Sequence, residues 1–366
     1  MRQNTNFNIA VLKGDGIGVD VIDAACAVLR AVEAKVGGFS LDLEELPGGA
    51  GYYRDTGEDM PASSWEKVHA ADAILLGAIG IPEVRHADGT EIAPHLRIRE
   101  ELGLYAGVRP IKAYANAPRR LADERAAAID LIILRESTEG LFYTQGRGEV
   151  IDDTEAFETL RISRATSEKL FDFAFRLAAK RKASGGQGKV TCVDKANVFR
   201  AFAFFRKIFD ERAAHFPDIK AAHNYVDAQA LDLIRKPWEF DVLVTENMFG
   251  DILSDLAGGL VGGMGMASCA EIGDNHALFQ PAHGSAPDIA GLGIANPLAT
   301  ILSAGLMLDW LGDRFENEDL HQAGARINAA VDQGFAEDRI RPKEFGGDHG
   351  TTEITDIVVQ MIEQQD

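Results

Sequence analysis

Short apolar runs alternate with longer amphipathic segments along most of the chain, and this alternation limits the possible fold more than any other feature. The runs lie at 9–12, 73–76, 131–134, 190–193 and 242–244. Between them, apolar residues recur at helical spacing, as in Val21, Ile22, Ala25, Val28, Leu29 and Val32. The short runs are typical of buried strands and the spaced residues of helices with one apolar face. The sequence therefore predicts an α/β fold in which helices cover the faces of a sheet.

Aromatic residues also recur at helical spacing in two segments. One predicted face carries Leu170, Phe171, Ala174, Phe175 and Ala178, and another carries Val198, Phe202, Phe205 and Phe209. Aromatic side chains are usually buried, so we interpret both faces as core and not as contacts with a cofactor.

The charge balance excludes two classes of partner. The chain has 366 residues, with 37 Lys and Arg against 57 Asp and Glu, and a net charge of −20. A chain this acidic repels nucleic acid and anionic membranes. If its substrate is an anion, the site must contain its own positive charge, as clustered arginines or lysines or as a metal ion.

The cysteines and the apolar segments bear on the compartment. Cys26, Cys192 and Cys269 are widely spaced and form neither a zinc pattern nor a disulfide framework, so we expect a reducing, cytoplasmic environment. The first apolar run is too short for a signal peptide, and no run is long enough to span a bilayer. The length suggests two domains or one large α/β unit.

A glycine-rich loop, Gly14-Asp15-Gly16-Ile17-Gly18, follows the first predicted strand and precedes a predicted helix. That position suits a dinucleotide-binding loop, but the spacing does not, because the third glycine of that motif falls on Val19. The alternative is a tight turn from strand to helix, where glycine supplies backbone freedom.

An acidic pair, Asp251 and Asp255, lies four residues apart, so both side chains share one face if the segment is helical. Adjacent carboxylates repel each other unless a cation lies between them. Oxygen ligands without Cys or His favour Mg²⁺ or Mn²⁺ over zinc. A solvated helix face is the alternative, and the apolar and glycine residues around the pair argue against it.

Basic residues occur where a ligand of an α/β sheet is expected, at strand ends. Lys195 follows the predicted strand 190–193, and a lysine among apolar neighbours near a metal can act as a base. Arg99, Arg109 and Arg135 could hold carboxylates through two parallel hydrogen bonds each. A surface lysine and surface ion pairs are the alternatives.

A loop of small residues, running from His283 through Gly284, Ser285 and Ala286 to Asp288, allows close approach of backbone to a ligand, and Asn296 follows it. A carboxylate such as Asp288 can accept a hydrogen bond from a ribose hydroxyl and would repel a 2′-phosphate, which favours NAD over NADP. The alternative is a structured surface loop.

In their order along the chain, these motifs resemble the isocitrate/3-isopropylmalate dehydrogenase family. The resemblance extends from about residue 8 to about residue 358 and also includes Arg135 to Gly140, Tyr225-Val226-Asp227 and Gly346-Gly347. Its most specific parts are Thr245 to Asp255 and the loop from His283 to Asp288.

The resemblance implies a two-domain α/β fold that is not a Rossmann fold, with a large sheet flanked by helices. Residues 1–105 and 262–366 would form the cofactor-binding domain, and 106–261 the substrate, metal and dimerisation domain. It also implies a homodimer whose active sites are shared between subunits. The glycine loop is then structural.

The resemblance also implies a role for each motif. Arg99, Arg109 and Arg135 would hold the malate part of a substrate, and Lys195 would be the general base from across the dimer. The Mg²⁺ or Mn²⁺ ligands would be Asp251 and Asp255 with Asp227 of the other subunit. The adenosine contacts of NAD would come from the loop: His283, Gly284, Ser285, Ala286, Asp288 and Asn296.

Three positions depart from the family pattern. The family's proton-donating tyrosine is replaced by Phe142, so we expect Tyr143 or a water to donate the proton. The segment that selects the substituent at C3 contains His95, which fits neither the isopropylmalate nor the isocitrate pattern. Gln280 replaces a glutamate near the cofactor.

From these residues we expect an NAD- and metal-dependent dehydrogenase that oxidises and decarboxylates a small (2R)-2-hydroxy dicarboxylic acid. If His95 faces the C3 group, a polar or absent substituent, as in tartrate or D-malate, suits it better than an isopropyl group. The alternative substrate is 3-isopropylmalate. A catalytically silent regulatory subunit is disfavoured because the lysine, the aspartates and the arginines are all present.

Overall fold

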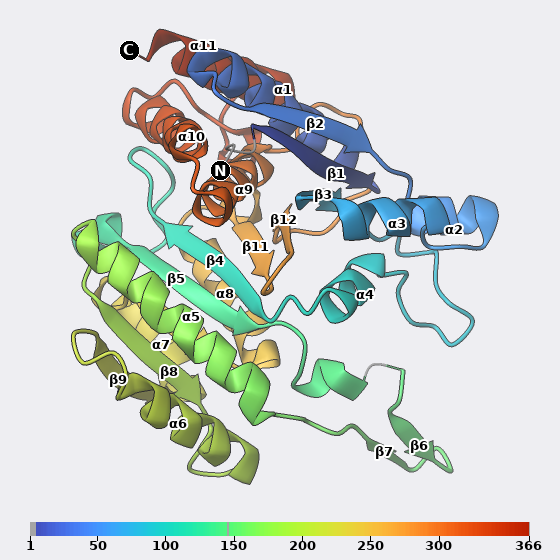
Figure 1. Ribbon diagram of the computed structural model, residues 1–366, viewed down its shortest axis with the longest axis vertical. Helices are drawn as coiled ribbons and strands as arrows, with labels where there is room; N and C mark the ends of the chain where they lie inside the picture. The colour runs from blue at the N-terminus through green and yellow to red at the C-terminus, as the bar shows by residue number, and fades with distance from the viewer. Residues whose placement is uncertain (1–4, 145, 366) are drawn as a thin grey trace.

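A computed structural model describes residues 5–144 and 146–365, and a ten-stranded mixed sheet runs through it (Figure 1). The strand order is β2-β1-β3-β12-β11-β4-β5-β10-β8-β9. Its strands are β1 (Asn6–Gly14), β2 (Ser40–Glu45), β3 (Ala73–Ala78), β4 (Ala106–Lys112), β5 (Asp130–Glu136), β8 (Lys189–Asp194), β9 (Lys220–Tyr225), β10 (Val242–Thr245), β11 (Ser268–Ile272) and β12 (Ala277–Pro281). A separate hairpin of β6 (Glu149–Ile151) and β7 (Glu155–Phe157) extends from one corner of the molecule (Figure 1).

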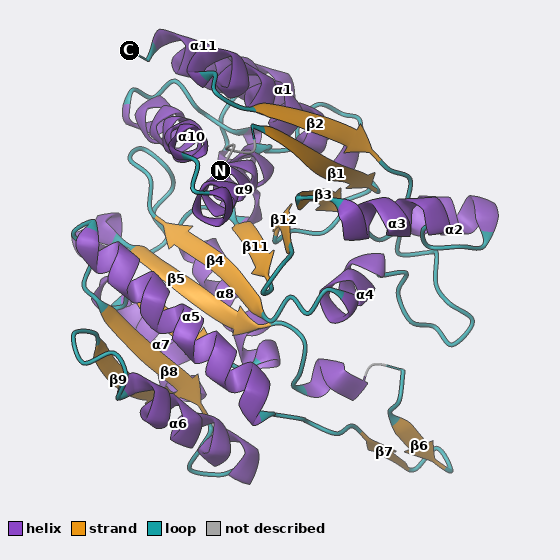
Figure 2. Cartoon of the chain, in the orientation of Figure 1, coloured by secondary structure: helices purple, strands orange, loops and turns teal. Residues whose placement is uncertain are grey.

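Helices flank both faces of the sheet (Figure 2). The α-helices are α1 (Gly18–Val36), α2 (Ala50–Thr56), α3 (Ala62–Ala70), α4 (Pro94–Glu101), α5 (Arg164–Ala183), α6 (Arg200–Ala213), α7 (Val226–Arg235), α8 (Asn247–Leu260), α9 (Leu298–Phe315), α10 (Glu318–Ala336) and α11 (Thr351–Gln364). Short 3-10 turns include η2 (Leu141–Thr144) and η4 (Met264–Met266). In residues 5–144 and 146–365, no helix is long and apolar enough to cross a membrane.

The predicted α/β class is confirmed, and so are the predicted strands, which became β1, β3, β5, β8 and β10. The six apolar residues predicted on the helix after the glycine loop are all buried in α1. The aromatic faces pack in the core as predicted, with Phe171 of α5 against Phe205 and Phe209 of α6 at ring separations of 4.6 and 5.3 Å. The prediction was wrong for Val198, which is 59 % exposed and precedes α6.

The apolar runs did not indicate β2, β4, β9, β11 and β12. Polar residues interrupt these strands: β4 contains Arg109, β11 contains Glu271, and β9 alternates polar and small residues at the edge of the sheet. Neighbouring strands and helices bury the first two side chains, so the tertiary structure outweighs the local sequence signal.

The seam between β11 and β4 divides the sheet into two halves of five strands. Strands β1, β2, β3, β11 and β12 come from the segments predicted as the cofactor domain, and the other five from 106–261. We propose that the two halves are the two domains. One apolar core nevertheless continues across the seam, because it includes residues of both halves such as Ala106, Val108 and Ala270.

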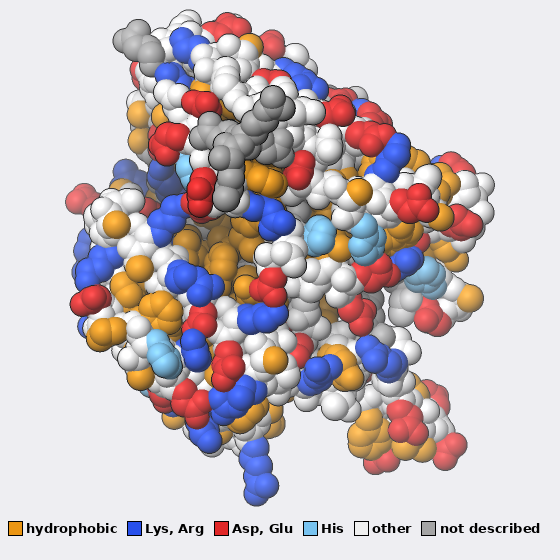
Figure 3. All heavy atoms as spheres, viewed as in Figure 1, with side chains coloured by type: hydrophobic (Ala, Val, Ile, Leu, Met, Phe, Trp, Pro, Cys, Tyr) orange, Lys and Arg blue, Asp and Glu red, His pale blue; other side chains and the backbone are white. Residues whose placement is uncertain are grey.

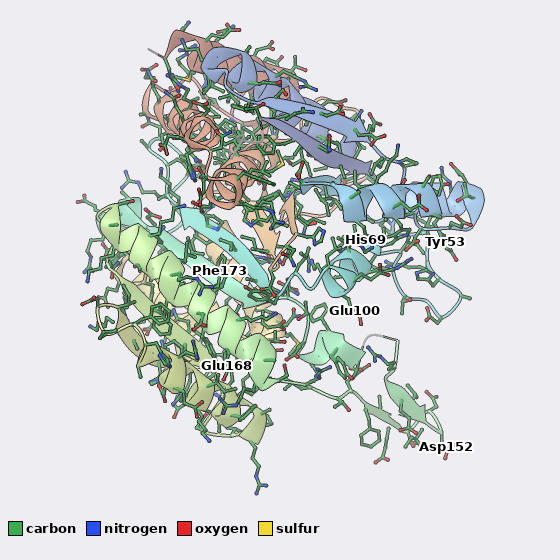
Figure 4. All side chains as sticks on the ribbon, in the orientation of Figure 1. Tyr53, His69, Glu100, Asp152, Glu168 and Phe173 are labelled. Atoms are coloured by element: carbon green, nitrogen blue, oxygen red, sulfur yellow. The ribbon has the colours of Figure 1, made fainter. Side chains whose placement is uncertain are left out.

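A hollow lined by hydrophobic side chains opens between the two halves on the face shown in Figure 3. Phe173 of α5, labelled in Figure 4, lines it together with Leu177 and Trp310. Three ion pairs join the halves around this region: Lys112 with Asp332, Lys169 with Asp274 and Lys180 with Asp313.

Candidate active site

The three arginines predicted to hold carboxylates come together on one face of the sheet. Arg135 of β5 lies opposite Gly107 of β4, and Arg109 follows two residues later on the same face of β4. Arg99 reaches them from α4, and all three arginines are at most 5 % exposed. Helix α8 lies close over β5 because Gly250 has no side chain; a Cβ there would be 2.7 Å from the Cβ of Arg135.

Polar side chains of α8 bind two of these arginines. Arg109 donates to Ser254 Oγ at 2.6 Å and lies 3.4 and 3.6 Å from carboxylate oxygens of Asp251 and Asp255. Arg135 donates from Nε to Asn247 Oδ1 at 2.8 Å and forms an ion pair with Asp251. Asp251 and Asp255 therefore share one face of α8, as the four-residue spacing predicted, and the structure places that face on the arginine cluster.

The cluster retains unused donor capacity. The Nε groups of both Arg99 and Arg109 are buried and have no hydrogen-bond partner. Burial, together with the positive charges of Arg109 and Arg99, lowers the pKa of Arg135 to about 10. Buried donors without partners cost free energy, which an anion with carboxylate oxygens would recover. The site is therefore suited to a small carboxylic acid.

Asp251 and Asp255 offer hard oxygen ligands at the edge of the arginine cluster, with side chains that are 43 % and 57 % exposed. Burial raises the pKa of Asp255, with a further contribution from the negative charge of Asp251, so a cation beside the pair would be stabilised. Among the described residues there is no group of three or more His, Cys, Asp or Glu that could hold a metal. Two carboxylates fit Mg²⁺ or Mn²⁺, but a further ligand must come from elsewhere.

Lys195 and Asp227 form an ion pair with each other, at the ends of the neighbouring strands β8 and β9. Asp194 fixes the turn before Lys195, because it accepts a hydrogen bond from the backbone N–H of Ala196 at 2.8 Å and is paired with Arg206. Asp227 itself is exposed, and its pKa is lowered chiefly by the hydrogen bond from Lys195. The structure thus joins these two residues and leaves Asp227 outside the Asp251–Asp255 pair.

His95 and Arg99 both lie in α4, four residues apart. Burial, followed by the charge of Arg99, lowers the pKa of His95 to about 3, so the ring is neutral at ordinary pH. Its Nδ1 is buried without a partner, and the nearby charges that act on it include Arg99, Arg135 and Glu271. The ring therefore lies beside the arginine cluster.

Phe142 and Tyr143 of η2 face different neighbours. The Phe142 ring lies 5.1 Å from the Arg135 guanidinium, measured to the ring centroid. The Tyr143 ring lies beside Arg147 and Arg161, at 4.7 and 4.4 Å. Both line a cavity that also contacts Glu100 of α4, which Figure 4 shows on the side of the helix toward η2. Phe142, and not Tyr143, occupies the position next to the arginines.

A second cavity, of about 410 Å³, lies where the small-residue loop meets η4 and the 343–344 turn. His283, Gly284, Ala286 and Asn296 line it. Glu344 joins them, accepting hydrogen bonds from Asn296 Nδ2 at 2.9 Å and from the Gly265 N–H. The cavity includes a buried, unpartnered Nε2 on His283, whose pKa is lowered by burial.

Such a partly apolar cavity with unsatisfied polar atoms fits a heterocyclic base. Two residues of the same loop are placed differently. Ser285 is buried and donates its hydroxyl to the Gly80 carbonyl, while Asp288 is exposed.

The glycine loop packs against that small-residue loop. A Cβ on Gly16, which has a φ of +58°, would lie 2.0 Å from the Ser285 carbonyl oxygen, and one on Gly14 would lie 1.9 Å from that of Ala78. The Ile17 N–H also donates to the Ser285 carbonyl at 2.7 Å. The glycines are therefore needed for close backbone packing. This supports the tight strand-to-helix turn that was the alternative to a dinucleotide-binding loop.

Four residues of the site were not identified from the sequence: Asn247, Ser254, Glu271 and Glu344. Asn247 and Ser254 lie next to the acidic pair on the face of α8 and could have been found from its helical period. A charged residue inside a strand of small and apolar residues was the signal for Glu271. No local pattern indicates Glu344, because its partners Gly265 and Asn296 lie far away in sequence.

Known proteins are similar to this chain over nearly its whole length. The family model described as isocitrate/isopropylmalate dehydrogenase matches residues 8–358. The 3-isopropylmalate/3-methylmalate dehydrogenase of Methanocaldococcus jannaschii is 40% identical over 98% of this chain and 99% of its own length. The 3-isopropylmalate dehydrogenase of Aquifex aeolicus is 39% identical over 98% of each chain.

Two solved structures are similar over nearly the whole chain. The isocitrate dehydrogenase of Methylococcus capsulatus has a TM-score of 0.83 at 33% identity, and the match covers 98% of this chain and 100% of that protein's chain. The β-decarboxylating dehydrogenase of Thermococcus kodakarensis, in its apo form, has a TM-score of 0.79 at 36% identity, with 98% and 96% covered.

Proposed function

Because the chain belongs to the isocitrate/isopropylmalate dehydrogenase family, we propose that it oxidises and decarboxylates a 3-alkyl-substituted (2R)-malate, with 3-isopropylmalate as the leading substrate. The chain is an oxidoreductase, a β-decarboxylating dehydrogenase acting on a hydroxy acid. The main support for a dicarboxylic substrate is the buried arginine cluster. The Nε groups of Arg99 and Arg109 have no hydrogen-bond partner and could donate to carboxylate oxygens. The names of the similar proteins support 3-isopropylmalate better than D-malate or tartrate.

We further propose NAD and Mg²⁺ or Mn²⁺ as the cofactors. The cavity around His283 and Asn296 would hold the adenosine of NAD, and Asp251 and Asp255 would hold the cation. When bound, the cation lowers the pKa of the substrate's 2-hydroxyl, and NAD accepts the hydride from C2.

The protein's own residues would do the remaining work. Arg99, Arg109 and Arg135 bind and orient the carboxylates, which fixes C2 before hydride transfer. Lys195 takes the hydroxyl proton, directly or through Asp227. After CO₂ leaves, its bonding electron pair forms an enolate, and a proton must reach C3. Phe142 has no proton to give, so water or Tyr143 must supply it, and the contacts of Tyr143 with Arg147 and Arg161 favour water.

A second copy of the chain is part of the proposal. Apolar side chains are exposed on α7, at Leu231 (54 %) and Ile234 (45 %), and on the adjacent α8, at Ile252 (60 %). Exposed apolar side chains on neighbouring helices are typical of an interaction surface, and a two-fold dimer uses the same surface twice. Such a dimer would bring Lys195 and Asp227 of one copy to Asp251 and Asp255 of the other.

The test is a substrate panel read by NADH absorbance with Mn²⁺ present: 3-isopropylmalate, D-malate, tartrate, isocitrate and homoisocitrate. The proposal expects the highest kcat/KM with 3-isopropylmalate. It is wrong if isocitrate or homoisocitrate is preferred, or if none of the five acids is oxidised.

His95 favours a second candidate within the same reaction class, namely D-malate or tartrate. Its neutral ring with an unpartnered Nδ1 lies beside the arginine cluster, where an alkyl group at C3 cannot satisfy that nitrogen. The C3 hydroxyl of tartrate could satisfy it directly, and D-malate, which has no substituent at C3, leaves space for a water. If this contact decides the specificity, D-malate or tartrate has the highest kcat/KM of the five acids, and His95→Leu shifts the preference toward 3-isopropylmalate. If the substrate preference of His95→Leu is unchanged, the His95 ring does not select the group at C3.

A further inference from the structure

Glu271 is a fully buried carboxylate that the proposed reaction does not use. It lies in the middle of β11, opposite Gly107 of β4, with 0 % of the side chain exposed. Gly107 in turn lies opposite Arg135, so the three positions form one row across the sheet. A Cβ on Gly107 would lie 2.9 Å from Glu271 Oε2, so this glycine leaves the space that the carboxylate occupies.

The carboxylate is fixed on the arginine cluster. Its Oε1 lies 3.0 Å from Nη2 of Arg99, whose side chain is 7 % exposed. Burial alone would raise the pKa of Glu271, but Arg99, Arg109 and Arg135 outweigh it and hold the pKa below the usual value. The group is therefore negatively charged at neutral pH. Among the groups that lower this pKa, the three arginines contribute more than the Ser137 hydroxyl, so the carboxylate is stabilised mainly by charge.

This carboxylate completes a balance of charges. The three guanidinium groups form ion pairs with three carboxylates, from Asp251, Asp255 and Glu271. These six ion-paired groups together carry no net charge, and the divalent cation proposed above would add two positive charges, which a substrate with two carboxylates neutralises. A third carboxylate would leave a net negative charge in a buried site, where close charges interact strongly.

We propose that Glu271 is a specificity-determining residue, which restricts the site to substrates with two carboxylates and disfavours those with three. The proposal rests on the proposed function for the identity of the site as a malate site. The match to two carboxylates uses the two charges of the cation, whereas the repulsion between Glu271 and a third carboxylate acts whether or not the cation is bound. The neutral His95 supplies no compensating cation for a third carboxylate.

Binding without turnover tests this inference. Affinities for D-malate, with two carboxylates, and isocitrate, with three, are measured by calorimetry without NAD, both with Mn²⁺ and with EDTA. The wild-type protein should bind D-malate at least about tenfold more tightly than isocitrate. Glu271→Gln keeps the shape of the side chain and removes its charge. It should lower the ratio of the affinity for D-malate to the affinity for isocitrate by about tenfold or more.

Two further variants serve as controls. Asp274→Asn removes the same charge three residues away, from an exposed side chain paired with Lys169, and should leave the ratio within about twofold of wild type. Glu271→Asp keeps the charge and should keep the preference for two carboxylates.

An unchanged ratio in Glu271→Gln would overturn the proposal. If that variant does not fold, a wild-type protein with equal affinity for the two acids overturns it as well. The proposed function fails separately, when the wild-type protein binds malates but oxidises none of them.

Discussion

Lys195 and Asp227 form an ion pair within one chain, while the acidic pair of α8, Asp251 and Asp255, contacts the arginines instead. Among the described residues, no third acidic side chain or histidine joins the acidic pair to make a metal site. The two parts of the proposed chemistry are therefore separate pairs within one chain, and we propose that a second copy of the chain brings them together.

A complementation experiment tests this shared site. As pure proteins, Lys195→Met should be inactive and Asp255→Asn should have only low activity at a Mn²⁺ concentration that saturates the wild type. Co-refolded in equal amounts, they should recover about a quarter of wild-type kcat per chain, because half of the dimers are mixed and each mixed dimer has one intact site. A mixture with no more activity than its components would place all the catalytic groups in one chain, and co-refolding each variant with wild type is the control.

The apolar face of α7 and α8 should hold the dimer together. Leu231→Glu places a charge on an apolar surface where it would be desolvated, and should yield a monomer of low activity. Val19→Glu, on an exposed valine of α1, is the matched control and should leave the oligomeric state unchanged. Light scattering after gel filtration distinguishes the two, and a wild-type monomer would contradict the interface.

Activity should require a divalent cation. The neighbouring carboxylates of Asp251 and Asp255 repel each other, and a bound cation relieves this repulsion. Exhaustive chelation should therefore abolish turnover, and Mn²⁺ or Mg²⁺ should restore it. Asp255→Asn should raise the Mn²⁺ concentration needed for half-maximal activity and lower kcat. Full activity in the chelated wild-type protein would contradict the metal site.

NAD should be preferred over NADP. Asp288 is exposed next to the cavity of His283, and Glu344 lines that cavity, so a 2′-phosphate would meet negative charge. A close like-charge contact costs on the order of 1–3 kcal/mol, or roughly ten- to a hundredfold in kcat/KM. Measured kcat/KM values for both cofactors decide the question, and Asp288→Asn should narrow the difference without affecting folding.

His95 should make stability depend on pH. An unfolded histidine titrates near about 6.5, whereas burial and the charge of Arg99 lower the pKa of His95 in the folded chain to about 3. Between these values only the unfolded chain binds the proton, so the stability is fully present above about pH 6.5 and is lost as the pH falls. From about pH 6.5 to about pH 5 the loss is about 2 kcal/mol.

His95→Gln should not show this part of the acid dependence. Urea unfolding gives the free energy of unfolding of wild type and of His95→Gln at about pH 7 and about pH 5. The loss between the two pH values should be larger in the wild type. Equal pH dependence in both proteins would mean that folding does not lower the pKa of His95.

The sequence by itself determined the fold class and the chemistry of most of the site. Periodic burial of apolar residues fixed α1, α5 and the central strands, because local spacing decides which side chains can share a face. The four-residue spacing of Asp251 and Asp255 likewise fixed their common direction on α8, and motif order indicated the family.

Only the tertiary structure decided which groups meet. Glu271 reaches Arg99 because β11 lies beside β4 in the sheet, and Phe142 rather than Tyr143 faces Arg135 because η2 is oriented by contacts from other segments. Lys195 pairs with Asp227 because β8 and β9 are neighbours. These contacts join residues of separate elements, so no periodic pattern within one element encodes them; they follow from how the elements pack, including strand order and the close packing at Gly107 and Gly250.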